Sequence, residues 1–209
     1  MKNLLVVNAS PQSHPSHSRE MTQRFITQWQ ASHPKGSIVY RELGGQPIPH
    51  VDEHWIDAAF TPAEQRTPAQ RETLALSDEL VEELQAADCL LMGVPMYNLS
   101  IPSTLKAYID QIIRMGVTTS LVPETPRSPY LGKLHGKKAY LMLSRGGYGY
   151  NPNGSYAHLN FQDNYLVEVL NMLGITDITR IALEYTAIGG DALQQALREA
   201  QQRIDQLSL

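Results

Sequence analysis

The chain has 209 residues, of which 42% are hydrophobic and 18% are charged, and its formal net charge at neutral pH is −4. This composition is ordinary for a globular protein, and the charge does not draw the chain to nucleic acid or to an anionic membrane. A chain of this length buries roughly 70% of its unfolded surface, so its core needs neither disulfides nor a metal. No apolar stretch approaches the roughly 18 residues of a membrane span and the N-terminus lacks a signal-peptide pattern, so we expect a cytoplasmic protein.

Five short apolar runs along the chain are typical of buried strands. Most are continuously apolar rather than alternating, as expected for a parallel sheet that is covered on both faces. The predicted strands are 4–8, 37–41, 88–94, 138–143 and 178–184, and helical patterns occupy 18–31, 67–88, 102–116, 164–174 and 192–207. Because strands and helices alternate, the class is α/β, and five strands favour a flavodoxin-like order with ligand beyond their carboxyl ends.

Two connections, 44–67 and 117–136, are too long to be plain links. Long ordered loops on a compact fold are often lids, pocket walls or subunit contacts. The first loop contains "HVDEH" at 50–54, which has the spacing of one class of zinc peptidase. No strong amphipathic helix surrounds it, so we expect a surface loop and no metal. The single cysteine, Cys89, lies in an apolar run and is expected to be a core residue.

A serine-rich loop follows the first strand, where an α/β protein binds anions. The N-terminus of the next helix offers free N–H groups, and Ser10, Ser16 and Ser18 offer hydroxyls. Arg19 is the only full positive charge there. The loop contains neither a Walker motif nor a dinucleotide fingerprint, so a phosphate monoester fits it better than ATP or a dinucleotide. A capped, solvated loop is the alternative.

Two further loops have a composition that is typical of ligand contacts. In "GVPMYNLSIPS", Tyr97 could stack on a flat ring and Asn98 could pair with a ring amide; the alternative is a turn with Tyr97 as a packing residue. In "LSRGGYGYNPNG", Gly146 and Gly147 allow close approach to a ligand or a positive φ; the alternative is a flexible turn. In a doubly wound fold the loops after strands one, three and four converge, which favours one binding site.

Together these loops resemble the FMN-dependent NADH-azoreductase family, relatives of the flavodoxin-like NAD(P)H:quinone oxidoreductases. The resemblance rests on "NAS", "SHS", "PMYNLSIPSTLKAYID", "GVT", "SRGG" and "NFQDNYLVEVLNMLGITDI". It implies a three-layer sandwich that forms one FMN-binding domain over residues 1–209, with FMN tightly bound, one per subunit. The implied FMN-binding residues are Ser10, Ser16, His17 and Ser18 at the phosphate, Pro95, Met96, Tyr97, Asn98 and Leu99 along the ring, and Ser144, Arg145, Gly146 and Gly147 at its other edge.

The resemblance also implies an activity. NADH or NADPH would give a hydride to the flavin and leave, and a quinone or an aromatic azo compound would then take two electrons. This is a ping-pong oxidoreductase in which no side chain need act as acid or base, and the subunits would pair as a homodimer. The alternative is an electron carrier or regulator without turnover, although the 117–136 loop favours a substrate pocket. Thr119 stands where the family often has an aromatic residue near the substrate, and Leu99 where it often has phenylalanine.

Overall fold

The computed structural model describes residues 2–12, 16–46, 48–122 and 128–209. A parallel sheet of five strands in the order β2-β1-β3-β6-β7 forms its centre. The strands are β1 (Asn3–Asn8), β2 (Ser37–Glu42), β3 (Cys89–Pro95), β6 (Lys138–Ser144) and β7 (Asp177–Leu183). All five predicted strands are confirmed, and no boundary is displaced by more than one residue.

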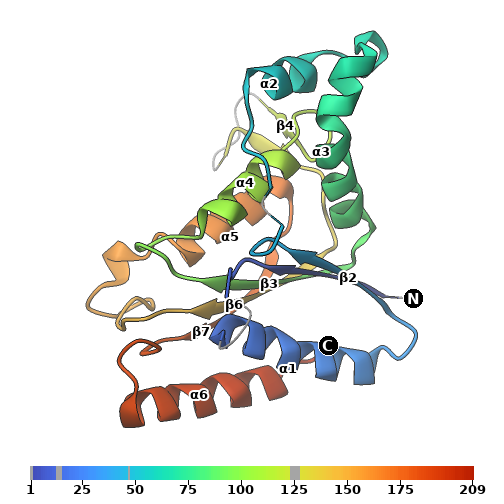
Figure 1. Ribbon diagram of the computed structural model, residues 1–209. Coiled ribbons are helices and arrows are strands. Elements are labelled where there is room, and N and C mark those ends of the chain that lie inside the picture. The colour runs from blue at the N-terminus through green and yellow to red at the C-terminus, as the bar shows by residue number, and fades with distance from the viewer. Residues whose placement is uncertain (1, 13–15, 47, 123–127) are drawn as a thin grey trace.

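Helices cover both faces of this sheet (Figure 1). On one face lie α1 (His17–Ser32) and α6 (Gly190–Asp205). On the other lie α3 (Pro68–Ala86), α4 (Ser103–Ile112) and α5 (Asp163–Leu173). This confirms the three-layer sandwich and its flavodoxin-like strand order. In the described part of the chain, no helix is both long and apolar enough to cross a bilayer.

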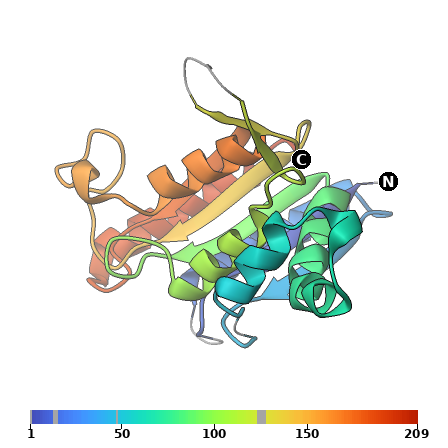
Figure 2. The same cartoon turned by 90° about the horizontal axis from the view of Figure 1, so that it is seen from above.

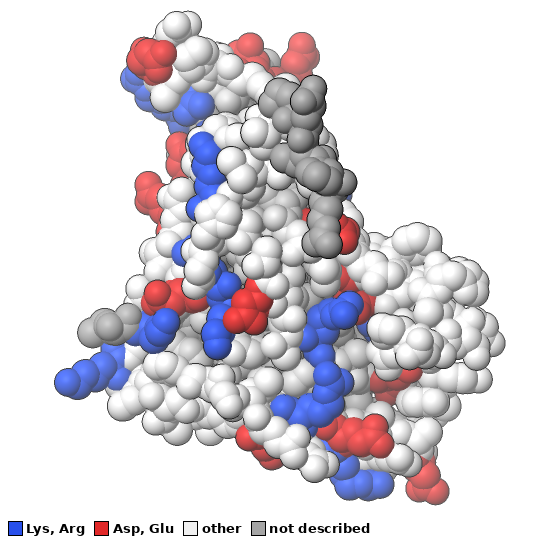
Figure 3. Space-filling view, turned by 180° about the vertical axis from the view of Figure 1, so that it is seen from behind, with Lys and Arg blue, Asp and Glu red and all other residues white. Residues whose placement is uncertain are grey.

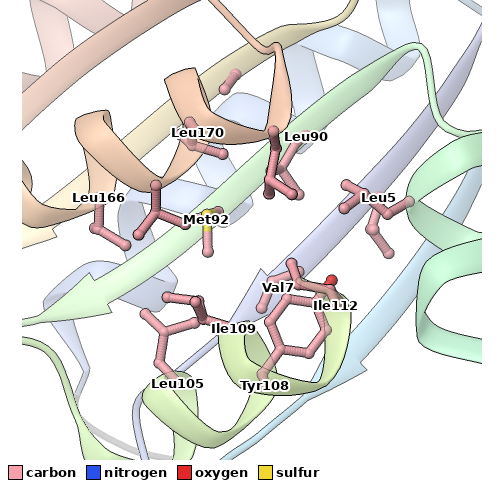
Figure 4. Packing of buried hydrophobic residues seen from close by; sticks show 14 of the residues in the cluster. Leu5, Val7, Leu90, Met92, Leu105, Tyr108, Ile109, Ile112, Leu166 and Leu170 are labelled. Carbon is pink, nitrogen blue, oxygen red and sulfur yellow. The ribbon is translucent and has the colours of Figure 1, made fainter. Parts of the chain in front are cut away.

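The apolar strands divide between two cores because successive side chains on a strand point to opposite faces. The core between the sheet and α4 and α5 is labelled in Figure 4 at Leu5, Val7, Leu90, Met92, Leu105, Tyr108, Ile109, Ile112, Leu166 and Leu170. On the opposite face, Leu4 and Val6 belong to the cluster that contains Phe25 of α1. Burying each apolar side chain of this kind stabilises the fold by about 1.5–3 kcal/mol. Because these side chains are buried on both faces, both cores stabilise the strands.

The first long connection folds into α2 (Glu53–Phe60) and the short helix η1 (Ala63–Gln65). The carboxylate of Asp52 caps α2 by accepting the Trp55 N–H at 2.8 Å, and Trp55 packs with Leu74 of α3. The expectation of a loop throughout 50–54 was therefore wrong, because this cap starts a helix inside the segment. Among the described residues, no group of three or more His, Cys, Asp or Glu side chains could hold a metal ion.

The second long connection forms an antiparallel pair, β4 (Thr119–Leu121) and β5 (Tyr130–Gly132), which lies beside α5 in Figure 2. The preceding helix ends at Ile112, not at Gly116, because Thr118 Oγ donates to the Ile112 carbonyl at 2.7 Å and closes a turn. Thr119 is 0% exposed. The expectation that Thr119 stands on a pocket wall was therefore wrong for this chain, since its side chain is buried within the hairpin and Oγ1 donates to the Leu131 carbonyl at 3.4 Å.

Candidate functional site

Three of the predicted loops meet at one edge of the sheet. The strand order places β1, β3 and β6 side by side, so their carboxyl ends are neighbours (Figure 1). Ala9 donates its N–H to the Gly93 carbonyl at 2.9 Å, and Met96 donates to the Ser144 carbonyl at 2.7 Å. The predicted convergence of the loops after strands one, three and four is thus present in the fold.

The serine loop ends at the N-terminus of α1. Ser10, Ser16 and Ser18 are buried, and the hydroxyl oxygens of Ser16 and Ser18 lie 3.4 Å apart. Ser16 is the N-cap residue, yet its own side chain makes no capping hydrogen bond. The first bond within the helix is Glu20 N–H to the Ser16 carbonyl at 3.0 Å, which leaves the first-turn N–H groups without a helical partner. Such a helix start, lined by hydroxyls, suits a phosphate.

Arg19 holds the shape of this loop rather than offering a free charge. Its guanidinium donates to the carbonyls of Ser10 at 2.8 Å and Gln12 at 2.9 Å, and it pairs with Glu42. Glu42 also accepts from Asn8 Nδ2 at 2.6 Å. A bound phosphate would therefore be held mainly by N–H groups and hydroxyls. Sequence reasoning missed Asn8 and Glu42, although Asn8 ends a predicted strand and Glu42 directly follows another; the two residues pair in register.

Close packing fixes the loop from two further sides. A Cβ on Gly44 would lie 2.2 Å from the Ser10 carbonyl oxygen, and a Cβ on Gly93 would lie 2.8 Å from Asn8 Oδ1. Only glycine fits either position without a shift of its neighbours. Beside the loop, between α1 and β2, a cavity of about 590 Å³ is lined in part by Asn8 and Ser16. Its lining also includes Tyr40 and Glu42 of the edge strand β2.

The segment after β3 is a tight turn. Tyr97 and Ser100 exchange N–H···O=C bonds at 2.9 and 3.0 Å, and both central residues are left-handed, Asn98 at φ 48° and Leu99 at φ 71°. These are the features of a type I′ turn. Residues other than glycine in this region cost about 1–3 kcal/mol each and cluster at functional sites. The Tyr97 side chain is exposed, so its ring is free to meet a planar ligand.

The segment after β6 approaches other parts of the chain closely. Neither Gly146 nor Gly147 has a positive φ; Gly149 does, at 79°. A Cβ on Gly146 would lie 3.1 Å from Ala187 Cβ, and one on Gly147 would lie 3.1 Å from Tyr150 Oη. Of the two roles expected for this glycine pair, positive φ was wrong, and close approach to a ligand stays a prediction, since the close neighbours here are side chains of the chain itself.

The expectation that Arg145 contacts the ring edge does not hold for its side chain. Its side chain is 0% exposed and lies in the interior, where Nη2 meets Asp163 Oδ1 at 2.9 Å and Nη1 meets Glu184 Oε1 at 3.2 Å. Nε donates to Gln162 Oε1 at 2.9 Å. These partners turn the guanidinium away from the surface, so it is not available to a ligand at the loop. The backbone of Arg145 ties this loop to the end of β7, because its N–H donates to the Leu183 carbonyl at 2.8 Å and its carbonyl accepts from the Thr186 N–H at 3.1 Å.

His17 contributes its backbone rather than its ring to the serine loop. Its Nδ1 lies 3.3 Å from Glu20 Oε2, and the ring lines a small cavity of about 90 Å³ together with Leu197 and Ile204 of α6. The imidazole thus lies between α1 and α6. The His17 N–H remains part of the helix start described above.

A fourth loop, 184–189, follows β7 and was missed by sequence reasoning. The N–H of Tyr185 donates to the Gly147 carbonyl at 2.8 Å, and the N–H of Ala187 donates to the Gly146 carbonyl at 3.1 Å. Glu184 was read only as the last residue of a strand. The fold instead joins this loop to the loop after β6.

An uncharged aromatic surface borders these loops. Residues 146–162 contain no Lys, Arg, Asp or Glu. Figure 1 draws this segment at the left. Figure 3 shows the molecule from behind, and a projection without charged residues lies at the corresponding right edge. Tyr148, Tyr156 and Phe161 are exposed, and Tyr148 stacks on Tyr185 with ring centroids 5.0 Å apart. The arrangement fits a phosphate monoester joined to a planar ring, because it combines an anion site with exposed aromatic surface.

The one cysteine takes no part in this site. Cys89 begins β3, at the opposite edge of the sheet, and burial raises the pKa of its thiol to about 12. A thiol with this pKa is almost entirely protonated at neutral pH and is a poor nucleophile. The prediction that Cys89 is a core residue is confirmed.

Comparison with known proteins supports the flavodoxin-like fold and shows which proteins this chain is similar to. A family model described as a flavodoxin-like fold matches residues 2–207. An FMN-dependent NADH:quinone oxidoreductase of Nostoc punctiforme is 45% identical over 204 residues, covering 98% of this chain and 97% of the relative. An FMN-dependent NAD(P)H:quinone oxidoreductase of Pseudomonas aeruginosa is 41% identical over 205 residues, covering 98% and 97%. The solved structure of an FMN-dependent NADH-azoreductase from Bacillus anthracis in complex with FMN has a TM-score of 0.84 at 22% identity, covering 100% of both chains, which shows the shared fold.

Proposed function

Because the chain belongs to the flavodoxin-like fold family, we propose that it is an FMN-dependent NAD(P)H:quinone oxidoreductase that also reduces aromatic azo compounds. The observation that carries the proposal is the open helix start at Ser16 beside the turns that follow β3 and β6. In this proposal the helix start binds the phosphate and the two turns, at adjacent strand ends, border a planar ring. The relatives named for this activity match the chain over nearly its whole length.

We assign the FMN phosphate to the hydroxyls of Ser10, Ser16 and Ser18 and to the first N–H groups of α1, that of His17 included. The ring would lie along Pro95, Met96, Tyr97, Asn98 and Leu99, with Ser144, Gly146, Gly147 and the backbone of Arg145 at its other edge. When bound, FMN supplies two-electron hydride chemistry between NAD(P)H and the acceptor.

The chain's own part is to bind and orient. The serine loop fixes the phosphate end, and the left-handed turn at Asn98 and Leu99 presents backbone groups and the Tyr97 ring to the planar end. We assign no side chain the role of acid or base. Donor and acceptor would use the same face in turn, which is a ping-pong scheme: a quinone needs one cycle to reach the hydroquinone, and an azo bond needs two cycles to give two amines.

We further propose that residues 1–209 act as one FMN-binding domain, that the chain pairs as a homodimer with the flavin near the interface, and that it works in the cytoplasm. Exposed large apolar side chains at the site and on the hairpin, such as Phe161 and Leu131, support pairing, because a partner would remove them from water. A buried, unpaired thiol suits a reducing compartment. Light scattering of the purified protein tests the dimer, and a monomeric mass at micromolar concentration contradicts it.

The test of the activity uses purified protein loaded with FMN. We expect it to retain FMN rather than FAD and to oxidise NADH or NADPH when menadione or methyl red is present. Parallel assays with both nicotinamides give the donor preference. A flavin-loaded protein that oxidises neither nicotinamide with any acceptor would leave an electron carrier or regulator as the remaining interpretation. A protein that fails to bind added FMN contradicts the cofactor assignment itself.

A further inference from the structure

Glu184 gathers three donors from the segment that follows β6. Its Oε2 accepts the Gly149 N–H at 2.8 Å, and its Oε1 accepts the Tyr150 N–H at 2.9 Å. Oε1 also lies 3.2 Å from Nη1 of Arg145. The side chain is 10% exposed, so these bonds form in a largely desolvated place where they are stronger than in water.

The backbone of the segment is shaped to meet this carboxylate. Gly149 is left-handed at φ 79°, and the N–H groups of Gly149 and Tyr150 donate to the two oxygens of one side chain. The ring of Tyr150 in turn lies against Gly147, where a Cβ would be 3.2 Å from its Cε2. The Tyr150 ring therefore fills the space beside Gly147 and links the position of this glycine to the turn at 149–150.

We propose that Glu184 is a positioning residue that holds Gly146 and Gly147 in the shape that the flavin ring requires, before the cofactor arrives. This inference rests on the proposed function, because it assigns the segment to the ring edge of FMN. Preorganisation strengthens binding by removing the entropy cost of ordering a loop when the ligand binds. In this account Glu184 contacts neither the nicotinamide nor the electron-accepting substrate, and it acts only through the backbone of the segment.

The same buried cluster contains a matched control. Asp163 binds Arg145 at 2.9 Å and Arg180 at 3.3 Å, but none of its hydrogen bonds or ion pairs reaches the turn at 149–150. Replacing either Asp163 or Glu184 with its amide removes one carboxylate from a buried ion cluster, so both variants lower the melting temperature. Only the Glu184 variant disturbs the acceptor of the Gly149 and Tyr150 N–H groups.

The experiment compares wild type, Glu184→Gln and Asp163→Asn. We expect Glu184→Gln to weaken FMN binding to the apoprotein at least about tenfold, and Asp163→Asn to change it less than about threefold at a similar loss of melting temperature. Hydrogen exchange on flavin-free wild type should show slow exchange of the Gly149 and Tyr150 amides, and Glu184→Gln should accelerate it. With FMN saturating, the Glu184 variant should raise KM for the nicotinamide more than it lowers kcat, because the loop that borders the ring is displaced.

Each outcome decides the inference. Unchanged FMN affinity in Glu184→Gln overturns it, as does an equal loss in Asp163→Asn, which would indicate general destabilisation. Fast exchange of both amides in flavin-free wild type also overturns it. If Glu184→Gln does not fold, Glu184→Asp keeps the charge beside Arg145 but is one methylene too short for the turn, and it should weaken FMN binding as well. Wild type that does not bind FMN refutes the proposed function instead, and this inference falls with it.

Discussion

Replacing Gly44 with alanine should damage the serine loop from behind. An ideal Cβ at this position would lie 2.2 Å from the Ser10 carbonyl oxygen and 2.5 Å from the Cα of Pro11, whereas real Cβ contacts are essentially never under 3.0 Å. Both contacts are with backbone, so the loop must move by about 1 Å, and no rotamer change relieves the clash. The same Ser10 oxygen accepts from Arg19 at 2.8 Å, so this movement also strains the bond that holds the loop.

The expected cost of Gly44→Ala is about 1–3 kcal/mol of stability, or about 2–4 °C of melting temperature per kcal/mol for a chain of this size. FMN affinity should fall at least about tenfold, because a displacement of this size disrupts the geometry of a binding site. Thermal unfolding and fluorescence titration of the apoprotein with FMN measure the two effects.

Gly45→Ala is the matched control, since a Cβ there meets nothing within 4 Å. It should stay within about 0.5 kcal/mol of wild type in both measurements. Wild-type FMN affinity in Gly44→Ala would refute the assignment of this loop to the phosphate. Equal damage in Gly45→Ala would refute the steric explanation.

Three further outcomes are expected. The double variant Ser10→Ala, Ser18→Ala should weaken FMN binding by about 2 kcal/mol or more, because charge-assisted bonds to the phosphate are lost; unchanged affinity in the same titration would remove these hydroxyls from the site. Asp52→Ala should lose about 1 kcal/mol in urea unfolding, because the cap of α2 is removed. Asp52→Asn should recover most of that loss, and equal losses would indicate another role for the carboxylate. Burial raises the pKa of Cys89 to about 12, so the unfolded chain loses this proton first and stability should fall as the pH rises above about 9. At about pH 10 the loss is on the order of 1–2 kcal/mol, and Cys89→Ala should show a flatter pH dependence; identical slopes would contradict the burial argument.

The sheet and its site edge could be predicted because their signals are local. Continuous apolar runs mark strands that are covered on both faces, and the positions of Asn8, Pro95 and Ser144 at strand ends then follow from the flavodoxin-like order. The left-handed cap at Gly174 likewise ends α5 where the sequence indicates. Short elements in which the apolar residues show no clear periodicity were missed: α2 has eight residues, and β4 and β5 have three each. A three-residue strand contains too few positions to show alternation.

The roles of individual side chains at the site were harder to predict, because their partners are distant in the sequence. Arg145 follows a serine that borders the site, so its position alone favours contact with the ligand. Three of its four acceptors lie 17 to 39 residues away in the chain, and only the fold shows that they surround it. Glu184 escaped notice for the same reason. Thr119 was misplaced because no local signal distinguishes a residue buried within a short hairpin from one that lines a pocket.

Two half-reactions measured separately, without oxygen, test the central claim most directly. FMN-loaded protein mixed with NADH or NADPH should lose its visible flavin absorbance, and menadione added afterwards should restore it. Both steps should be fast enough to account for steady-state turnover. Flavin absorbance that persists with both nicotinamides, in protein that holds FMN stoichiometrically, would contradict the proposed oxidoreductase.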